Sequence, residues 1–339
     1  METTVMQRLK ENLVQQKENL TSWLMGTQPE KREIRLGPLG EQGLQEHIHT
    51  LDTALQKAEE NTLGLCEVCH EYVEASRLEM DYTASVCIEH LTGEERTLLE
   101  NELELSAKVQ KALLPHSLPD IRGLDIAAFS QPAHIVGGDY FDFLRFKDGS
   151  HALVIADVMG KGMPASMLMA SLQASLRIIA PESTRPADVV ARLNTIFCHN
   201  IRLTKFVTLF LASYDEKART LTYCNAGHNP PLLHRSNGTI ETLRPTGAAI
   251  GLAEQTQFAQ KTTQLHPGDR IMMYTDGVVE SVNASKDEFG QDRIENVLKG
   301  SATGSSQQVI ASLRGDLQRF TGVTTPADDT TIIAVRVLN

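Results

Sequence analysis

Acidic residues recur at the ends of apolar runs in the last two-thirds of this chain, each within a few residues of glycine or a second acid. They are Asp139, Asp157, Asp276 and the adjacent pair Asp328 and Asp329. One Asp-Gly pair is common in turns, but turns alone do not explain four such places. Converging carboxylates repel one another unless cations neutralise them, and oxygen-only ligands favour Mg²⁺ or Mn²⁺. Because two such ions can activate water for in-line displacement at phosphorus, the pattern predicts phosphate chemistry.

The elements around these acids read as strands and helices. The apolar run 152–155 predicts a buried strand leading into Asp157, followed by glycines and a helix with proline in its first turn. Alternation from Tyr140 predicts a strand that begins directly after Asp139. Further strands are expected at about 124–129, 206–214, 220–226, 231–235, 257–265, 269–275 and 332–335, and helices at about 186–202, 288–299 and 305–320. The chain has no Walker loop, G-x-S-x-G elbow or dinucleotide fingerprint.

Five ordered motifs then carry a family resemblance: GGDYFD (137–142), ADVMGKG (156–162), AGHNP (226–230), TDGV with Glu280 (275–280) and DDTT (328–331). Residues from about 106 to 339 resemble the PPM family of metal-dependent serine/threonine phosphatases, and more narrowly its SpoIIE/RsbU group. The resemblance implies an α/β (α+β) fold, a β-sandwich of two antiparallel sheets flanked by helices. It places two metal ions at one edge between the sheets.

The resemblance also implies roles for residues at matching positions. Asp157 would bridge two Mn²⁺ or Mg²⁺ ions. Asp139 and the backbone carbonyl of Val158 would hold one of them, and Asp276 and Asp328 would hold the other. Asp329 would be an outer partner or the alternate ligand to Asp328. The implied reaction is direct attack of metal-activated water on phosphoserine or phosphothreonine, without a phosphoenzyme.

Two further residues have competing interpretations. Lys161 is a candidate for substrate contact, and the alternative is a solvated loop lysine. His228 could be a general acid, but its turn-forming neighbours favour a structural role. The general acid is therefore left unassigned, and no counterpart of the phosphate-binding arginine of eukaryotic members is evident.

The first third of the chain differs in charge and pattern. Residues 1–115 contain 11 Lys and Arg against 21 Asp and Glu, so they carry most of the net charge of −11. This acidity argues against a nucleic acid partner. Heptad-like apolar stripes predict helices at 1–25 and 43–63, separated by turn composition at 26–42. A folded-back hairpin and a parallel pairing with a second chain both fit.

Two close pairs of soft ligands follow these helices. The spacing is C-x2-C, seventeen residues, then C-x2-H, through Cys66, Cys69, Cys87 and His90. Four such ligands favour one structural Zn²⁺, and His70 competes with His90 as the fourth. The site could equally serve as a redox or metal sensor through its thiolates.

This zinc segment resembles the zinc finger of the DksA/TraR family over roughly residues 43–95. The match rests on LCEVC (65–69), ASRL (75–78) and Cys87-Ile88, with histidines at 70 and 90 where the family often has glycine and cysteine. Family members that act on RNA polymerase carry aspartates at the hairpin tip, and residues 1–51 contain none. The resemblance therefore implies a zinc-stapled fold, with RNA polymerase contact as an alternative role.

A charged helix is expected at 94–114, stopped by Pro115, and it is either a dimer seam or an amphipathic helix packed on its own domain. The expected organisation is a helical hairpin (1–64), a zinc finger (65–93), a connector helix (94–115) and a phosphatase domain (116–339). No membrane segment or secretory signal is evident, so a cytoplasmic location is expected.

The combined prediction is a phosphatase whose substrate, by resemblance, is a phosphorylated anti-anti-sigma (STAS-type) protein in a partner-switching pathway. The zinc-helical module would regulate the enzyme or form a homodimer. The alternatives are an inactive scaffold, which a missing metal aspartate would indicate, and a DksA-like regulator of transcription.

Overall fold

The chain folds into two compact units, Met1–Glu102 and Leu103–Asn339. The structure is a computed structural model, and it describes residues 3–26, 40–74, 77, 78, 81–200, 206–301, 304–323 and 326–339. Within these residues, no helix combines the length and the apolar character needed to cross a membrane.

The first unit is built on two helices, α1 (Thr3–Gly26) and α3 (Gly40–Glu59). Leu9 and Leu13 of α1 are buried in one cluster with Leu51 of α3, and Lys17 forms an ion pair with Asp52 at 2.5 Å. The two predicted helices are present, and their contacts within one chain agree with the folded-back hairpin. Most of the predicted turn between them, residues 27–39, lies outside the described residues.

The connector helix α5 (Gly93–Leu113) contains the boundary between the units. Thr92 and Glu95 form a reciprocal capping box at its start: the Thr92 N–H donates to the Glu95 carboxylate at 2.9 Å, and the Glu95 N–H donates to Thr92 Oγ1 at 3.3 Å. The helix ends two residues before Pro115, which cannot continue it. The predicted helix at 94–114 is therefore confirmed.

The second unit contains two five-stranded sheets in which all strand pairs are antiparallel. One, the β10 sheet, has the order β1 (Leu124–Gln131), β10 (Thr330–Val337), β9 (Arg270–Tyr274), β6 (Leu232–His234) and β7 (Ile240–Thr242). The other, the β3 sheet, has the order β2 (Tyr140–Arg145), β3 (His151–Val158), β4 (Val207–Asp215), β5 (Thr220–Ala226) and β8 (Lys261–Gln264).

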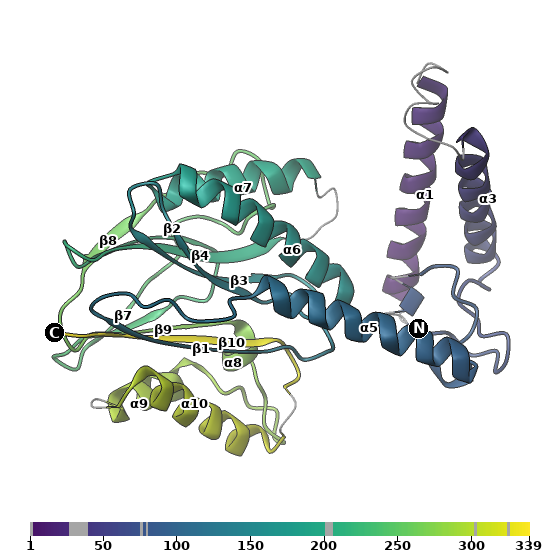
Figure 1. Ribbon diagram of the computed structural model, residues 1–339. Helices are drawn as coiled ribbons and strands as arrows, with labels where there is room; N and C mark the ends of the chain where they lie inside the picture. The colour runs from purple at the N-terminus through teal and green to yellow at the C-terminus, as the bar shows by residue number, and fades with distance from the viewer. Residues whose placement is uncertain are drawn as a thin grey trace. The chain divides into compact units, whose positions relative to one another are not determined.

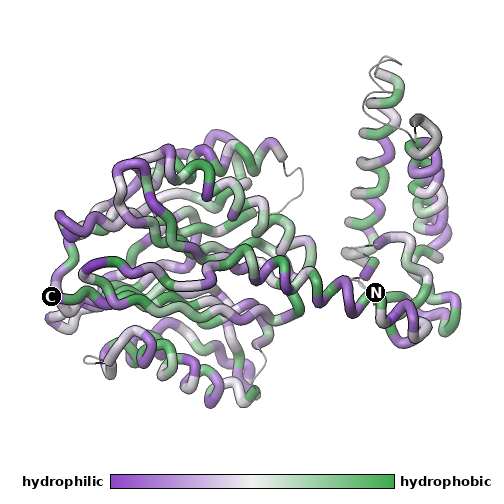
Figure 2. Tube along the Cα trace, in the orientation of Figure 1, coloured by the Kyte–Doolittle hydropathy of each residue, from purple (hydrophilic) through white to green (hydrophobic). Residues whose placement is uncertain are grey.

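Helices cover the outer face of each sheet (Figure 1). Helices α6 (Gly162–Ile179) and α7 (Pro186–Asn200) pack on the β3 sheet, and α9 (Gln291–Gly300) and α10 (Ser306–Thr321) pack on the β10 sheet. A third apolar core lies between the two sheets. Figure 2 shows the hydrophobic residues gathered along the strands of this unit. The predicted sandwich of two antiparallel sheets flanked by helices is confirmed.

Strand β3 shows why its sequence reads as a continuous apolar run. Ala152 and Val154 face the core under α6 and α7, whereas Leu153 and Ile155 face the core between the sheets. Both faces of the strand are thus buried, so no polar alternation is required. This places Asp157 at the end of one of the most buried strands of the fold.

A few elements differ from the sequence expectations. The strand expected at 257–265 forms only at Lys261–Gln264, where a polar edge strand pairs with β5 alone. The three-residue strand β7 and the one-turn helix α8 (Asp276–Val279) were not predicted, because neither is long enough to show a periodic pattern.

Candidate active site and cysteine-histidine cluster

Asp139 and Asp157 are brought together by one antiparallel strand pair. Strand β2 begins at Tyr140, which pairs with Ala156 near the end of β3. Asp139 directly precedes β2, so the same register places it beside Asp157. An antiparallel pairing thus joins two acids that are eighteen positions apart in the sequence.

The second strand pair does the same in the other sheet. Strand β9 ends at Tyr274, opposite Ile332 of β10, and the Thr275 N–H donates to the Thr331 carbonyl at 3.1 Å. Asp276 follows the end of β9, and Asp328 with Asp329 precedes the start of β10. These acids therefore lie at the same end of neighbouring strands.

Hydrogen bonds tie the two acid-bearing ends together across the sheets. The buried hydroxyl of Thr275 donates to Asp139 Oδ2 at 2.8 Å, and the N–H of Gly138 donates to Asp329 Oδ2 at 2.6 Å. Thr275, next to the β10 sheet, thus binds Asp139 at the start of the β3 sheet. Gly138, next to the β3 sheet, in turn binds Asp329. The acids of the two sheets form a single cluster at one edge of the sandwich.

Electrostatics within the cluster show that its acids interact strongly. Burial, and then the charges of Asp276 and Asp328, raise the pKa of Asp157 to about 7. Burial, and then the charge of Asp157, raise the pKa of Asp139 well above its usual range. The pKa of Asp276 is raised by burial and by Asp328 and Glu280. Without a cation, this arrangement is costly.

The donor set fits hard divalent cations. Oδ1 of Asp139 is buried without a hydrogen-bond partner among the described residues, although buried carboxylate oxygens are normally paired. A β-carbon on Gly138 would lie 2.7 Å from the Val158 carbonyl oxygen, so this glycine lets Asp139 approach that carbonyl. All candidate donors are oxygens, which suits Mg²⁺ or Mn²⁺. In the described part of the chain, no three acidic groups place oxygens all within 4.8 Å of one another.

Asp328 and Asp329 have different surroundings despite being neighbours. Asp328 is half-exposed and forms an ion pair with Lys161 Nζ at 2.8 Å, while the same Nζ donates to the Ala327 carbonyl at 2.9 Å. Asp329 is buried, and its Oδ1 and Oδ2 accept from the N–H groups of Ala133 and Gly138 at 2.8 and 2.6 Å. Two backbone N–H groups thus bind the Asp329 carboxylate. The Asp328 carboxylate is bound by Lys161 and by the backbone N–H of Asp329.

His228 is buried behind the cluster. Its Nδ1 lies 2.9 Å from Thr208 Oγ1, and Thr208 is the β4 residue paired with Asp157. The backbone N–H of His228 donates to Asn225 Oδ1 at 2.8 Å, and this bond fixes the turn that the sequence indicates. Burial lowers the pKa of His228 to about 3, so the ring is neutral near pH 7. These features favour the structural interpretation of this histidine.

The sequence analysis assigned no role to three residues that support the cluster. Thr275 holds Asp139, and Glu280 adds negative charge near Asp157 and Asp276. Gln110 of α5 is buried, and its amide exchanges two hydrogen bonds with the backbone of Gly137. Thr275 and Glu280 sit inside a recognised motif, which was a usable signal. Gln110 lies in a charged helical segment, where nothing in the local pattern distinguishes it.

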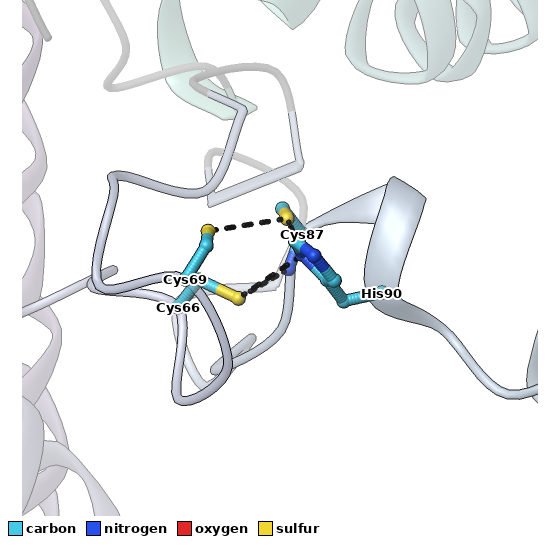
Figure 3. Close-up of side chains that lie close together, drawn as sticks. All are labelled: Cys66, Cys69, Cys87 and His90. Carbon is cyan, nitrogen blue, oxygen red and sulfur yellow. Dashed lines mark hydrogen bonds between the residues drawn. The ribbon is translucent and has the colours of Figure 1, made fainter.

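A second candidate site lies in the first unit. The four ligand atoms of Cys66, Cys69, Cys87 and His90 all lie within 4.8 Å of one another (Figure 3). The Sγ atoms of Cys69 and Cys87 are 3.9 Å apart, and Cys66 Sγ is 3.8 Å from His90 Nδ1. Tetrahedral Zn²⁺ with Zn–S bonds of about 2.3 Å would separate two sulfurs by roughly 3.8 Å. The soft donor set and the separation of these two sulfurs suit zinc.

The local backbone supports this cluster. N–H groups of Cys69, Cys87 and Val68 point at the Cys66 sulfur and lower the pKa of that thiol to about 6. His70 is not among the clustered ligands, and its backbone has φ +59°, a left-handed conformation that glycine adopts at less cost. The structure thus brings His90, and not His70, to the three cysteines.

Comparison with known proteins gives consistent matches. The family model described as Stage II sporulation protein E (SpoIIE) matches residues 147–338. Phosphoserine phosphatase RsbU of Bacillus subtilis is 28% identical over 239 residues, which cover 70% of each chain. Protein IcfG of Synechocystis is 30% identical over 269 residues, 69% of this chain and 41% of that protein. The SiaA-PP2C domain of Pseudomonas aeruginosa superimposes with a TM-score of 0.64 at 19% identity, covering 72% of this chain and 99% of that one.

Proposed function

Because this chain belongs to the SpoIIE family, a group of metal-dependent serine/threonine phosphatases with the PP2C fold, we propose that it dephosphorylates a phosphorylated regulatory protein. The observation that carries the proposal is the convergence of acids from both sheets at one edge, joined by the Thr275–Asp139 hydrogen bond. An inactive scaffold is disfavoured because no acid of this cluster is missing from the chain.

The family uses Mg²⁺ or Mn²⁺, and the donor set described above fits these ions. We assign Asp139 and the Val158 carbonyl to one ion and Asp276 and Asp328 to the other, with Asp157 shared. When bound, the ions supply an activated water and neutralise charge on the phosphate. Asp329 would position the 133–138 loop through its two backbone hydrogen bonds, leaving direct coordination to Asp328.

The substrate proposed is a phosphoserine or phosphothreonine on an anti-anti-sigma (STAS-type) protein in a partner-switching pathway. Its support is the similarity to a phosphoserine phosphatase, RsbU, over 70% of this chain. Lys161 stands beside Asp328 and is the cation in the described site best placed to meet an incoming phosphate.

For the first unit, we propose a structural Zn²⁺ held by the cysteine-histidine cluster, and a regulatory or dimerising role. Leu98, Leu105 and Val109 of α5 are 64%, 62% and 54% exposed, and their spacing of seven and four residues is typical of a coiled-coil seam. A second copy of the chain would bury them. Replacement of Leu98 and Leu105 by Glu should then halve the mass measured by light scattering, and an unchanged mass would contradict a seam here.

The test of the activity is hydrolysis of p-nitrophenyl phosphate by the purified full chain, with Mn²⁺ and with a chelator. We expect Mn²⁺-dependent turnover that Asp157→Asn abolishes. Asp292→Asn, which makes the same change at an exposed acid in the first turn of α9, is the control for nonspecific effects of the substitution. Turnover that is independent of metal, or that survives Asp157→Asn, would refute the assignment.

A further inference from the structure

A groove beside the acid cluster has walls that belong partly to the candidate active site. Its volume is about 480 Å³, and it lies between α10, the end of β1 and the segments next to Glu280 and Asp328. Ala327, which lines it, directly precedes Asp328 and accepts a hydrogen bond from Lys161. Ser281, another lining residue, donates to the Gly277 carbonyl at 2.7 Å. The groove therefore continues the surface on which the phosphate would be placed.

The lining combines apolar surface with one charge. Phe129, Leu317, Val282 and Val323 supply apolar groups, and the two valines are 46% and 56% exposed. Arg314 is the only charged residue among the described residues of the lining. Such a surface favours an apolar side chain accompanied by a negative charge.

The Arg314 side chain lies over an aromatic ring in the groove. Its guanidinium carbon is 3.7 Å from the centre of the Phe129 ring, within the range of a cation–π contact. Neither a hydrogen bond nor an ion pair to Arg314 is found among the residues that the structure describes. An arginine without such a partner can bind a carboxylate.

Resting on the proposed function, we propose that this groove is a specificity subsite that binds the substrate chain next to its phosphorylated residue. The occupant is a segment with an aliphatic side chain for the valine-lined wall and an acidic residue for Arg314. Ala327 lines the groove and directly precedes Asp328, so the occupant lies close to the phosphoserine in the substrate chain.

The test uses two synthetic phosphoserine peptides that share a leucine and differ only in a flanking Glu or Lys. For the full chain with Mn²⁺, we expect kcat/KM to be about three- to tenfold higher for the Glu peptide, the range of an exposed ion pair and its reversal. Arg314→Glu should reverse this preference. It should leave the hydrolysis of p-nitrophenyl phosphate, which has no flanking chain, unchanged.

Arg319→Glu provides a matched control, because it makes the same charge change on α10 at a residue outside the groove. It should leave the peptide preference as in the native protein. An equal preference in the native protein and Arg314→Glu would overturn the subsite. A change in oligomeric mass without a change in preference would assign the groove to a second copy instead. Absence of Mn²⁺-dependent hydrolysis of p-nitrophenyl phosphate and of both peptides would refute the proposed function itself, and the subsite with it.

Discussion

The side-chain amide of Gln110 pairs with both backbone polar groups of Gly137, two residues before Asp139. Its Nε2 donates to the Gly137 carbonyl at 2.6 Å, and its Oε1 accepts from the Gly137 N–H at 3.0 Å. A glycine is required at 137, because a β-carbon there would collide with the Asp329 carboxylate. One buried glutamine of α5 thus fixes the backbone that delivers Asp139 to the acid cluster.

We therefore expect Gln110→Ala to weaken metal binding as well as the fold. It leaves two buried backbone groups unpaired, at a cost of about 1–3 kcal/mol each where water cannot replace the amide. The Mn²⁺ concentration for half-maximal activity should rise by about tenfold or more, corresponding to about 1.4 kcal/mol. Mn²⁺ titration of activity measures this.

Lys111→Ala, at the next and exposed position of α5, is the control and should change neither quantity. If Gln110→Ala lowers the unfolding temperature but leaves the Mn²⁺ dependence as in the native protein, Gln110 serves the fold alone.

The two neighbouring acids before β10 should respond differently to the same substitution. Asp329→Asn replaces an acceptor oxygen by an amide that faces a backbone N–H, so we expect a loss of about 2 kcal/mol in the free energy of unfolding. Asp328→Asn removes a half-exposed ion pair with Lys161 and also the repulsion of Asp157 and Asp276, so the two opposing effects should change stability by less than about 1 kcal/mol. It should nevertheless abolish Mn²⁺-dependent activity. Urea unfolding with EDTA and activity with Mn²⁺ separate the two effects.

The reverse pattern, with Asp328→Asn unfolding the protein and Asp329→Asn retaining its stability, would exchange the proposed roles of these acids. Retained activity in Asp328→Asn would remove it from the set of metal ligands.

Asp157→Asn should stabilise the metal-free protein while abolishing activity. The pKa of Asp157 in the folded state, about 7, is above its unfolded value, so its ionisation opposes folding. For the native protein without metal, the stability gained from protonated Asp157 is fully present below about pH 4 and is lost as pH rises through 7. At pH 8, the variant should therefore be more stable by on the order of 2 to 4 kcal/mol.

The measurement is urea unfolding in EDTA from pH 5 to pH 8, compared between the native protein and the variant. We expect their difference to grow with pH, and to shrink when Mn²⁺ is added to the native protein. A difference that is constant with pH would mean that burial and the neighbouring charges do not raise the pKa of Asp157.

Most of the fold could be predicted from the sequence because the patterns that predict its elements are local. The apolar run 152–155 predicts strand β3, and the acids mark the ends of β3 and β9. What could not be foreseen depends on contacts between distant residues. The Asp329 carboxylate is claimed by N–H groups nearly two hundred positions away, at Ala133 and Gly138. No local pattern contains that information, so the choice between Asp328 and Asp329 stayed open.

The same distinction applies to the cysteine-histidine cluster. The two ligand pairs were visible as spacing, but His70 and His90 are equally plausible by type. The choice depends on the path of the chain: His70 lies in a left-handed turn, and His90 ends a short 3-10 helix that begins just after Cys87. The backbone conformation, rather than the residue type, separates the two.

This distinction gives a prediction in which the two histidines respond in opposite ways. His90→Ala should lower the zinc affinity by at least about a hundredfold, since each of four ligands accounts for several kcal/mol of binding. His70→Gly should keep zinc and stabilise the first unit by about 0.5–1 kcal/mol, because relief of the left-handed strain exceeds the added chain entropy of glycine. Competition with a chromophoric chelator measures the affinity. The unfolding transition that responds to this chelator measures the stability.

Loss of zinc from His70→Gly, with retention in His90→Ala, would make His70 the fourth ligand. A native protein purified without zinc, and unable to bind it, would contradict the zinc site altogether.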